Sequence, residues 1–93
     1  MDIVVVDNPA QSRFEIQVDG QVAGFARYRL APGKIVFTHT EIDPVYEGKG
    51  LGSRLAAGAL DAARARSLGI EPQCPFIAAY VQRHPEYQAL VVQ

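Results

Sequence analysis

Three glycines fall within five residues in the segment Gly48-Lys49-Gly50-Leu51-Gly52, between a stretch typical of a β-strand and a stretch typical of an α-helix. Glycine lets the backbone turn tightly and approach a ligand closely. The first turn of the following helix adds unpaired N–H groups and the positive end of the helix dipole. We therefore expect the main chain over residues 48–53 to bind an anion, with phosphate or pyrophosphate as the natural ligand.

Two basic residues accompany this segment, Lys49 inside it and Arg54 on the first turn of the expected helix. Either could neutralise a phosphate, although single basic residues at such positions are often only solvated.

A single cysteine, Cys74, stands directly before Pro75 at a second expected helix start. The helix dipole there favours the thiolate, the nucleophilic form of cysteine. Cys74 could therefore form a covalent intermediate or flank a reacting group, and it could equally be a small buried hydrophobic residue. One cysteine excludes an internal disulfide and a cysteine-rich zinc site, and we expect no metal.

His39 and Glu41 lie two residues apart on an expected strand, just before the glycine segment. Side chains at this spacing share one face of a strand, and either residue could act as a general base. The alternative is a histidine that lines a partly apolar face and a solvated carboxylate at the strand end.

The elements that must position these residues begin with an antiparallel meander. Apolar and polar residues alternate before Asp19-Gly20, a dipeptide suited to a type I′ hairpin. A second strand starts at Gln21 and runs to Pro32-Gly33, which suits a type II turn. The third strand of the meander is expected over residues 34–42.

Two-residue loops at both turns would fix the strand register. The predicted opposing pairs are then Ile16 with Ala23, Phe14 with Phe25, Tyr28 with Phe37, and Ala26 with His39.

Helical periodicity follows the glycine segment. An apolar stripe predicts an amphipathic helix of about four turns that ends at Gly69. The stripe consists of Leu51, Leu55, Ala59, Leu60 and Ala63. A short extended piece over residues 70–73 then leads to the second helix, whose predicted stripe is Phe76, Ile77, Tyr80 and Val81 and which Pro85 ends. The tail over residues 86–93 fits no single element.

The order β-β-β-β-α-β-α predicts a mixed α/β fold in which the strands before and after the long helix are parallel. Length and composition predict one domain over residues 1–93, with 48% hydrophobic and 20% charged residues. A net charge of −1 gives no footprint for nucleic acid or an anionic membrane. We therefore expect a small-molecule ligand. We also expect a cytoplasmic protein, because residues 1–7 show neither a basic leader nor a small-residue cleavage site.

The run from Ile42 to Leu55 resembles the acetyl-coenzyme A (acetyl-CoA) motif of the GNAT acetyltransferases. That motif places Gln or Arg, two residues, Gly, one residue, and Gly or Ala between the fourth strand and a long helix. Gly50 and Gly52 match, whereas Glu47 occupies the Gln/Arg position. The resemblance implies cofactor contacts from Ile42, Gly48, Lys49, Gly50, Leu51, Gly52, Ser53 and Arg54.

More narrowly, the chain resembles the compact YjdJ-type branch of small GNAT-like proteins, through the segments 74–80 and 84–87. This resemblance covers Phe14 to about Leu90 and implies a sheet splayed around the pantetheine arm. It implies transfer of an acetyl group from acetyl-CoA to an amine on an unidentified small molecule or protein. Cys74, His39 and Glu41 are then candidates at the reaction centre. Tyr80 could protonate the leaving sulfur, although its spacing also suits core packing.

Two other functions fit the same residues. The chain could be a non-catalytic module that binds or senses acyl-CoA, or an interaction domain whose glycines serve only a tight turn. The sequence leaves open whether the chain is a monomer or a homodimer that covers a sheet face.

Overall fold

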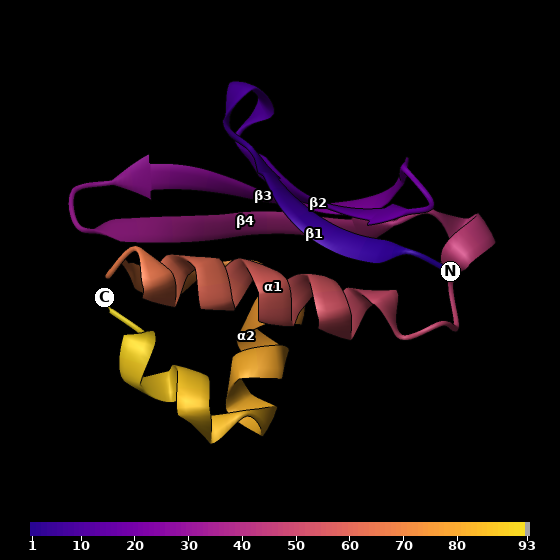
Figure 1. The fold of residues 1–93 in the computed structure, drawn as a ribbon. Helices are drawn as coiled ribbons and strands as arrows, with labels where there is room; N and C mark the ends of the chain where they lie inside the picture. Colours follow the sequence, from indigo (N-terminus) through magenta and orange to yellow (C-terminus); the bar gives the residue numbers. More distant parts are fainter. Residues whose placement is uncertain (93) are drawn as a thin grey trace.

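The computed structural model describes residues 1–92, which form a five-stranded sheet with helices on one side (Figure 1). The strands lie in chain order: β1 (Ile3–Asn8), β2 (Arg13–Val18), β3 (Gln21–Ala31), β4 (Lys34–Ile42) and β5 (Gly69–Pro72). The helices are α1 (Leu51–Ala65) and α2 (Pro75–Arg83), with short 3₁₀ turns η1 (Pro9–Gln11), η2 (Pro44–Tyr46) and η3 (Pro85–Leu90). Strands β1 to β4 are antiparallel and β5 is parallel to β4, which confirms the predicted mixed α/β order.

Both predicted turns form with the expected backbone signs. Asp19 and Gly20 have φ angles of 50° and 84°, as a type I′ turn requires at its two central positions. Gly33 has a φ of 74°, which suits the third position of a type II turn.

The predicted register is right only next to the turns, because each hairpin contains a bulge. Tyr28 pairs with Phe37 as expected. Beyond that, Ile16 faces Gly24, Phe14 faces Ala26, and Ala26 faces Thr40, so the predicted pairs with Ala23, Phe25 and His39 are wrong.

Each bulge inserts one unpaired residue, Ala23 in β3 and Thr38 in β4. An extra residue moves every side chain beyond it to the other face of its strand. Phe25 and His39 therefore lie on the face opposite Phe14 and Ala26.

The core lies between the sheet and the helices. The five residues of the predicted α1 stripe are all buried, which confirms that prediction. They join Phe14, Ile16 and Phe37 from the sheet in one apolar cluster. The helix ends at Ala65, before the predicted limit of Gly69, since Ser67 takes a left-handed φ of 57° and Gly69 already begins β5.

Three of the four predicted α2 positions are buried: Ile77, Tyr80 and Val81. Phe76 is the exception, with 38% of its surface exposed, because it reaches over the start of α1 rather than into the core. The tail forms η3, and Val91 bridges to Ile70 beside it. Only the last residue of that tail lies outside the described range.

The parallel pair is short. Strand β5 pairs with β4 only over Lys34–Phe37, and the Cys74 N–H donates to the Phe37 carbonyl (2.9 Å) as the chain leaves the sheet. In the rest of β4, Thr38 is the bulge residue and residues 39–42 are paired by β3 alone. Across residues 1–92, no helix is both long and apolar enough to cross a membrane.

Candidate functional site

The glycine segment forms the connection between η2 and α1. The Asp43 carboxylate accepts from the Val45 N–H (3.0 Å) and fixes the start of η2. Gly48 and Gly50 then take left-handed φ angles of 80° and 73°, and Gly50 is the N-cap of α1. These two positions therefore require glycine for the turn itself.

The amides that follow are free of protein acceptors. Within residues 1–92, no backbone or side-chain oxygen accepts a hydrogen bond from the N–H groups of residues 48–53. The helical bonding of α1 begins only at the Arg54 N–H, which donates to the Gly50 carbonyl (3.4 Å). A helix N-terminus with unpaired amides is a binding site for an anion.

A hollow of about 280 Å³ lies beside these amides. Its walls come from the end of β4, the η2 turn, the glycine segment and the start of α2. The lining residues are Ile42, Tyr46, Glu47, Gly48, Gly50, Leu51, Gly52, Ser53 and Phe76.

Phe76 is a site residue that the sequence interpretation placed in the core. Its ring lies against Gly52, where an added Cβ would meet the ring at 2.8 Å. Gly52 therefore serves close approach, because it is not among the glycines with positive φ. A glycine inside the first helical turn was the sequence signal for such a contact.

The charges around this hollow oppose one another. Lys49 and Arg54 are exposed, and in the described part of the chain neither lies within ion-pair distance of a carboxylate. Glu47 is also exposed and lines the hollow. Two cations can thus approach an anion bound at the amides, whereas the Glu47 carboxylate opposes it.

Cys74 lies at the N-cap of α2 and is only 3% exposed. Its Sγ lies 3.2 Å from the Thr40 Oγ1, at the point where β5 has left β4. The sequence interpretation did not include Thr40. Its position between His39 and Glu41 was the available signal, because alternate residues of a strand lie on opposite faces.

His39 and Glu41 lie together on the other face of the sheet. The His39 Nε2 is 3.2 Å from the Glu41 Oε2, and their side chains are 56% and 61% exposed. The fold therefore pairs these two candidates with each other and separates them from Cys74 by the thickness of the sheet.

Tyr80 has a third set of neighbours. Its ring stacks on His84 (centroids 3.8 Å apart, 17° between planes), and the His84 Nδ1 lies 2.8 Å from the Tyr80 carbonyl oxygen. Burial raises the pKa of the Tyr80 hydroxyl, and the Glu86 and Asp61 carboxylates raise it further. The hydroxyl is thus a proton donor at neutral pH. The described contacts of the Tyr80 ring are with His84 and Tyr87.

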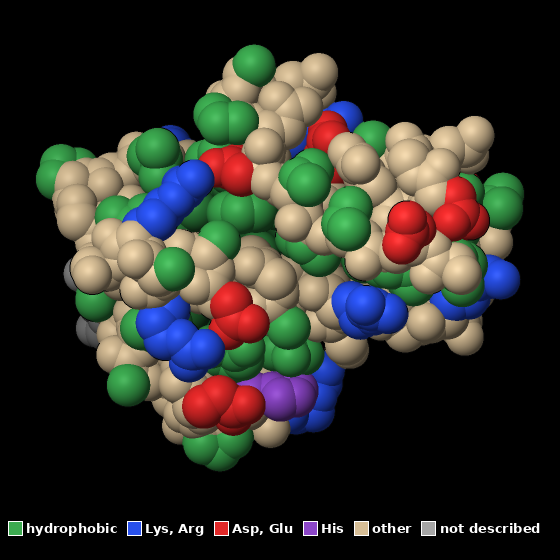
Figure 2. All heavy atoms as spheres, viewed as in Figure 1, with side chains coloured by type: hydrophobic (Ala, Val, Ile, Leu, Met, Phe, Trp, Pro, Cys, Tyr) green, Lys and Arg blue, Asp and Glu red, His purple; other side chains and the backbone are tan. Residues whose placement is uncertain are grey.

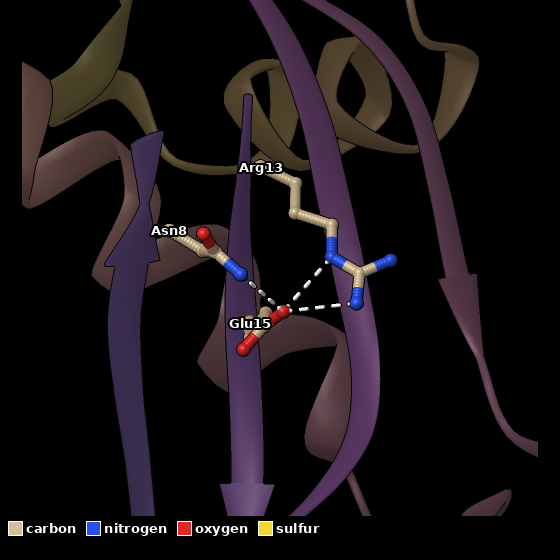
Figure 3. A network of polar contacts seen from close by, with 3 residues as sticks. All are labelled: Asn8, Arg13 and Glu15. Carbon is tan, nitrogen blue, oxygen red and sulfur yellow. Dashed lines mark hydrogen bonds and ion pairs between the residues drawn. The ribbon is translucent and has the colours of Figure 1, made fainter. Parts of the chain in front are cut away.

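The uncovered face of the sheet also carries a buried carboxylate. Glu15 is 6% exposed and accepts from the Arg13 Nε (2.9 Å) and the Asn8 Nδ2 (3.1 Å), as Figure 3 shows. These contacts lower the pKa of Glu15, with the Asn8 hydrogen bond as the largest cause.

Elsewhere charges are mixed: on the side of the molecule in Figure 2, acidic and basic side chains are interspersed. No three metal-ligating side chains of residues 1–92 come together.

The sequence matches the family described as GCN5-related N-acetyl-transferase over residues 13–90. The fold is similar to the solution structure of a GCN5-like protein from Staphylococcus aureus, at 21% identity and a TM-score of 0.72, covering 96% of this chain and 87% of that chain. It is also similar to ribosomal-protein-alanine N-acetyltransferase from Brucella melitensis biovar Abortus 2308, at 19% identity and a TM-score of 0.57, covering 87% and 61%. No curated protein matches the chain.

Proposed function

Because the chain belongs to the GCN5-related N-acetyltransferase family, we propose that it transfers an acetyl group from acetyl-CoA to an amine. Family membership assigns the chain to the acetyltransferases, whose general acetyl donor is acetyl-CoA. That this chain uses acetyl-CoA, and that its acceptor is an amine, are both parts of the proposal.

The observation that carries the proposal is the set of unpaired amides over residues 48–53. They stand at the positive end of α1, beside a hollow, with two exposed cations nearby. This arrangement fits the pyrophosphate of coenzyme A, which carries negative charge and accepts several hydrogen bonds. Ile42, Leu51 and Phe76 would contact the less polar part of the cofactor.

Acetyl-CoA supplies an activated thioester carbonyl when it is bound. In direct transfer, the amine nitrogen forms a bond to the carbonyl carbon, the C–S bond breaks, and the nitrogen loses a proton to a base. Glu41 and His39 are the candidate bases, and the Tyr80 hydroxyl is the candidate donor to the departing sulfur.

A covalent route would use Cys74 instead. Its thiolate would bond to the carbonyl carbon as the C–S bond to coenzyme A breaks and the coenzyme A thiolate leaves. The amine would then bond to the same carbon and lose a proton to a base, as the Cys74 thiolate leaves. The 3.2 Å contact between the Cys74 Sγ and the Thr40 Oγ1, in the part of β4 that β5 does not pair, supports this route, since the hydroxyl can donate to a thiolate and hold it in place.

A non-catalytic acyl-CoA-binding module is the second candidate. One observation favours it: the four catalytic candidates fall into three separate groups, with Cys74 beside Thr40, His39 beside Glu41, and Tyr80 beside His84. This module would use the same amides and need no base close to the thioester. The narrower YjdJ-type placement stays a prediction.

Calorimetry with acetyl-CoA tests cofactor binding. We expect binding below millimolar concentration, and at least a roughly tenfold loss of affinity in Gly50→Val, because a β-branched residue at a φ of 73° distorts the amides. Gly33→Val is the matched control, since Gly33 has a φ of 74° and the same open surroundings but lies in the β3–β4 turn. Absence of binding by the wild type, or equal losses in both variants, would contradict the role of the amides.

Intact mass and amine acetylation separate the enzyme from the binding module. Acetyl-CoA should yield an acetylated amine within a broad panel, and a gain of one acetyl group on the protein that disappears in Cys74→Ala supports the covalent route. Acetylation of an amine by Cys74→Ala at the wild-type rate supports direct transfer. Cofactor binding with neither product identifies the binding module.

A further inference from the structure

A second hollow, of about 300 Å³, lies between the start of β3 and the end of β4. Figure 1 shows this end of the sheet, where the chain leaves β4 and turns toward α1. Gly24 belongs to its lining and pairs with Ile42 of β4. A Cβ on Gly24 would lie 2.5 Å from the Glu41 carbonyl oxygen and 2.6 Å from the Ile42 Cδ1. The backbone of Glu41 and the side chain of Ile42 therefore occupy the place that a side chain at Gly24 would take.

The lining combines apolar surface with negative charge. Val22, Phe25 and Pro44 provide the apolar part, and Glu41 and Asp43 are the only charged residues that line it. The Asp43 carboxylate is held by the Val45 N–H, and the Glu41 carboxylate has His39 as its one ion-pair partner among the described residues. Arg13 and Arg27 lie nearby on the Phe25 ring (4.8 and 5.4 Å to its centroid) but do not line the hollow.

The two hollows meet at one residue. Ile42 lines the hollow beside the glycine segment and also the hollow at Gly24. A transferase needs its donor and acceptor close together, and through Ile42 a guest in the hollow at Gly24 would lie next to a cofactor bound in the first hollow. Two carboxylates without a lining cation favour a positively charged guest and disfavour an anion.

We propose that the hollow at Gly24 binds the acceptor, and that this acceptor is a small organic cation. Its ammonium lies at Glu41 and Asp43, and its apolar part lies on Val22 and Phe25. This inference rests on the proposed acetyl transfer for its meaning, but the binding event itself can be tested without acetyl-CoA.

The test is an NMR titration of the full chain with n-butylammonium and with 1-butanol, a neutral probe of similar shape. Butylammonium should shift the backbone amide signals of residues 22–25 and 41–43 saturably, and butanol should bind at least about tenfold more weakly. Glu41→Gln should weaken butylammonium binding about three- to tenfold. Glu86→Gln, which removes the same charge from the exposed start of η3, should leave it unchanged.

Val22→Arg is a second variant, because Val22 is 43% exposed and an arginine there would place a cation in the hollow. It should abolish the shifts while the spectrum stays folded. Equal binding of butanol and butylammonium, shifts centred on other residues, or equal weakening by Glu86→Gln would overturn the proposal. Acetyl-CoA calorimetry on the same samples separates the two proposals: cofactor binding without amine binding removes only the acceptor site, and amine binding without cofactor binding removes the proposed transfer.

Discussion

The two halves of β4 differ in their neighbours. Residues 34–37 are paired on both sides, by β3 and by β5, and Ile35, Val36 and Phe37 are completely buried. Residues 38–42 have only β3 beside them, and they carry Thr40 next to Cys74, the His39–Glu41 pair, and the wall shared by both hollows.

The first half of β4 therefore contributes mainly to stability, and the second half carries the side chains that could react or bind. In the first half, side chains fill the core, so their removal leaves a cavity. In the second half, the departure of β5 leaves one strand edge free, and the bulge at Thr38 decides which side chains face the helices. We therefore expect changes in the first half to affect unfolding and changes in the second half to affect reactivity or binding.

The largest expected effect is on the first half. Phe37→Ala should lower the free energy of unfolding by about 3–5 kcal/mol, because the ring is fully buried and packs beside Phe14. Urea denaturation followed by circular dichroism measures this loss.

Ile42→Ala in the second half is the comparison, with an expected loss of about 1–2 kcal/mol, because Ile42 is partly exposed. Similar losses in the two variants would show that the halves do not differ in the way proposed.

Alkaline pH should destabilise the fold through two buried tyrosines, Tyr28 and Tyr87. Burial and the Asp7 carboxylate raise the pKa of Tyr28, the cross-strand partner of Phe37, to about 12 from 10.0. A pKa raised by folding means that the stabilisation is complete below about pH 10 and is lost as the pH rises through about 12. Denaturation at about pH 9 and about pH 11 should show a loss on the order of 1–2 kcal/mol from this residue.

Tyr28→Phe should reduce that alkaline loss. Tyr87, whose pKa burial and Asp61 also raise to about 12, should account for a further part, so Tyr28→Phe/Tyr87→Phe should reduce the loss more than either single change. An alkaline loss that is the same in all four proteins would contradict this assignment.

Two carboxylates flank Phe25 on the uncovered face and test the comparison further. Glu15 is buried in its contacts with Asn8 and Arg13, whereas Glu41 is exposed. Glu15→Gln should cost about 1–2 kcal/mol at neutral pH, because it weakens charge-assisted hydrogen bonds. Glu41→Gln should cost less than about 0.5 kcal/mol.

The acid dependence follows from the lowered pKa of Glu15. Its stabilisation is present above about pH 4.5, the unperturbed value, and is lost as the pH falls through the lower folded value. Denaturation at about pH 3 and about pH 7 should therefore differ less in Glu15→Gln than in the wild type. An unchanged difference would show that other groups carry the acid sensitivity.

Local chemistry made much of this fold predictable. Asp19-Gly20 and Pro32-Gly33 determine their turns through positive φ angles, and the apolar period of α1 selects the face it buries. The glycine segment was likewise readable, since only glycine suits the positions of Gly48 and Gly50.

The arrangement of the candidate site was not readable in the same way, because it depends on one inserted residue. Without the bulge at Thr38, His39 would face Ala26 and lie on the covered face with Glu41. With the bulge, Thr40 takes that place and contacts Cys74. A bulge reflects how the whole strand fits its neighbours, so no local pattern in the sequence specified it. The same limit applies to Phe76, whose place depends on how α2 meets α1.

The smallest expected change in stability concerns Thr40 itself. Thr40→Val keeps the shape of the side chain but removes the hydroxyl, so the free energy of unfolding should change by less than about 1 kcal/mol. The rate of Cys74 alkylation by iodoacetamide at neutral pH should fall about three- to tenfold, because the thiolate loses a donor. Thr40→Ser should restore the rate, since it keeps the hydroxyl. If Thr40→Val instead destabilises the fold as strongly as Phe37→Ala, or alkylation is equally fast in all three proteins, the second half of β4 supports the core and does not tune the thiol.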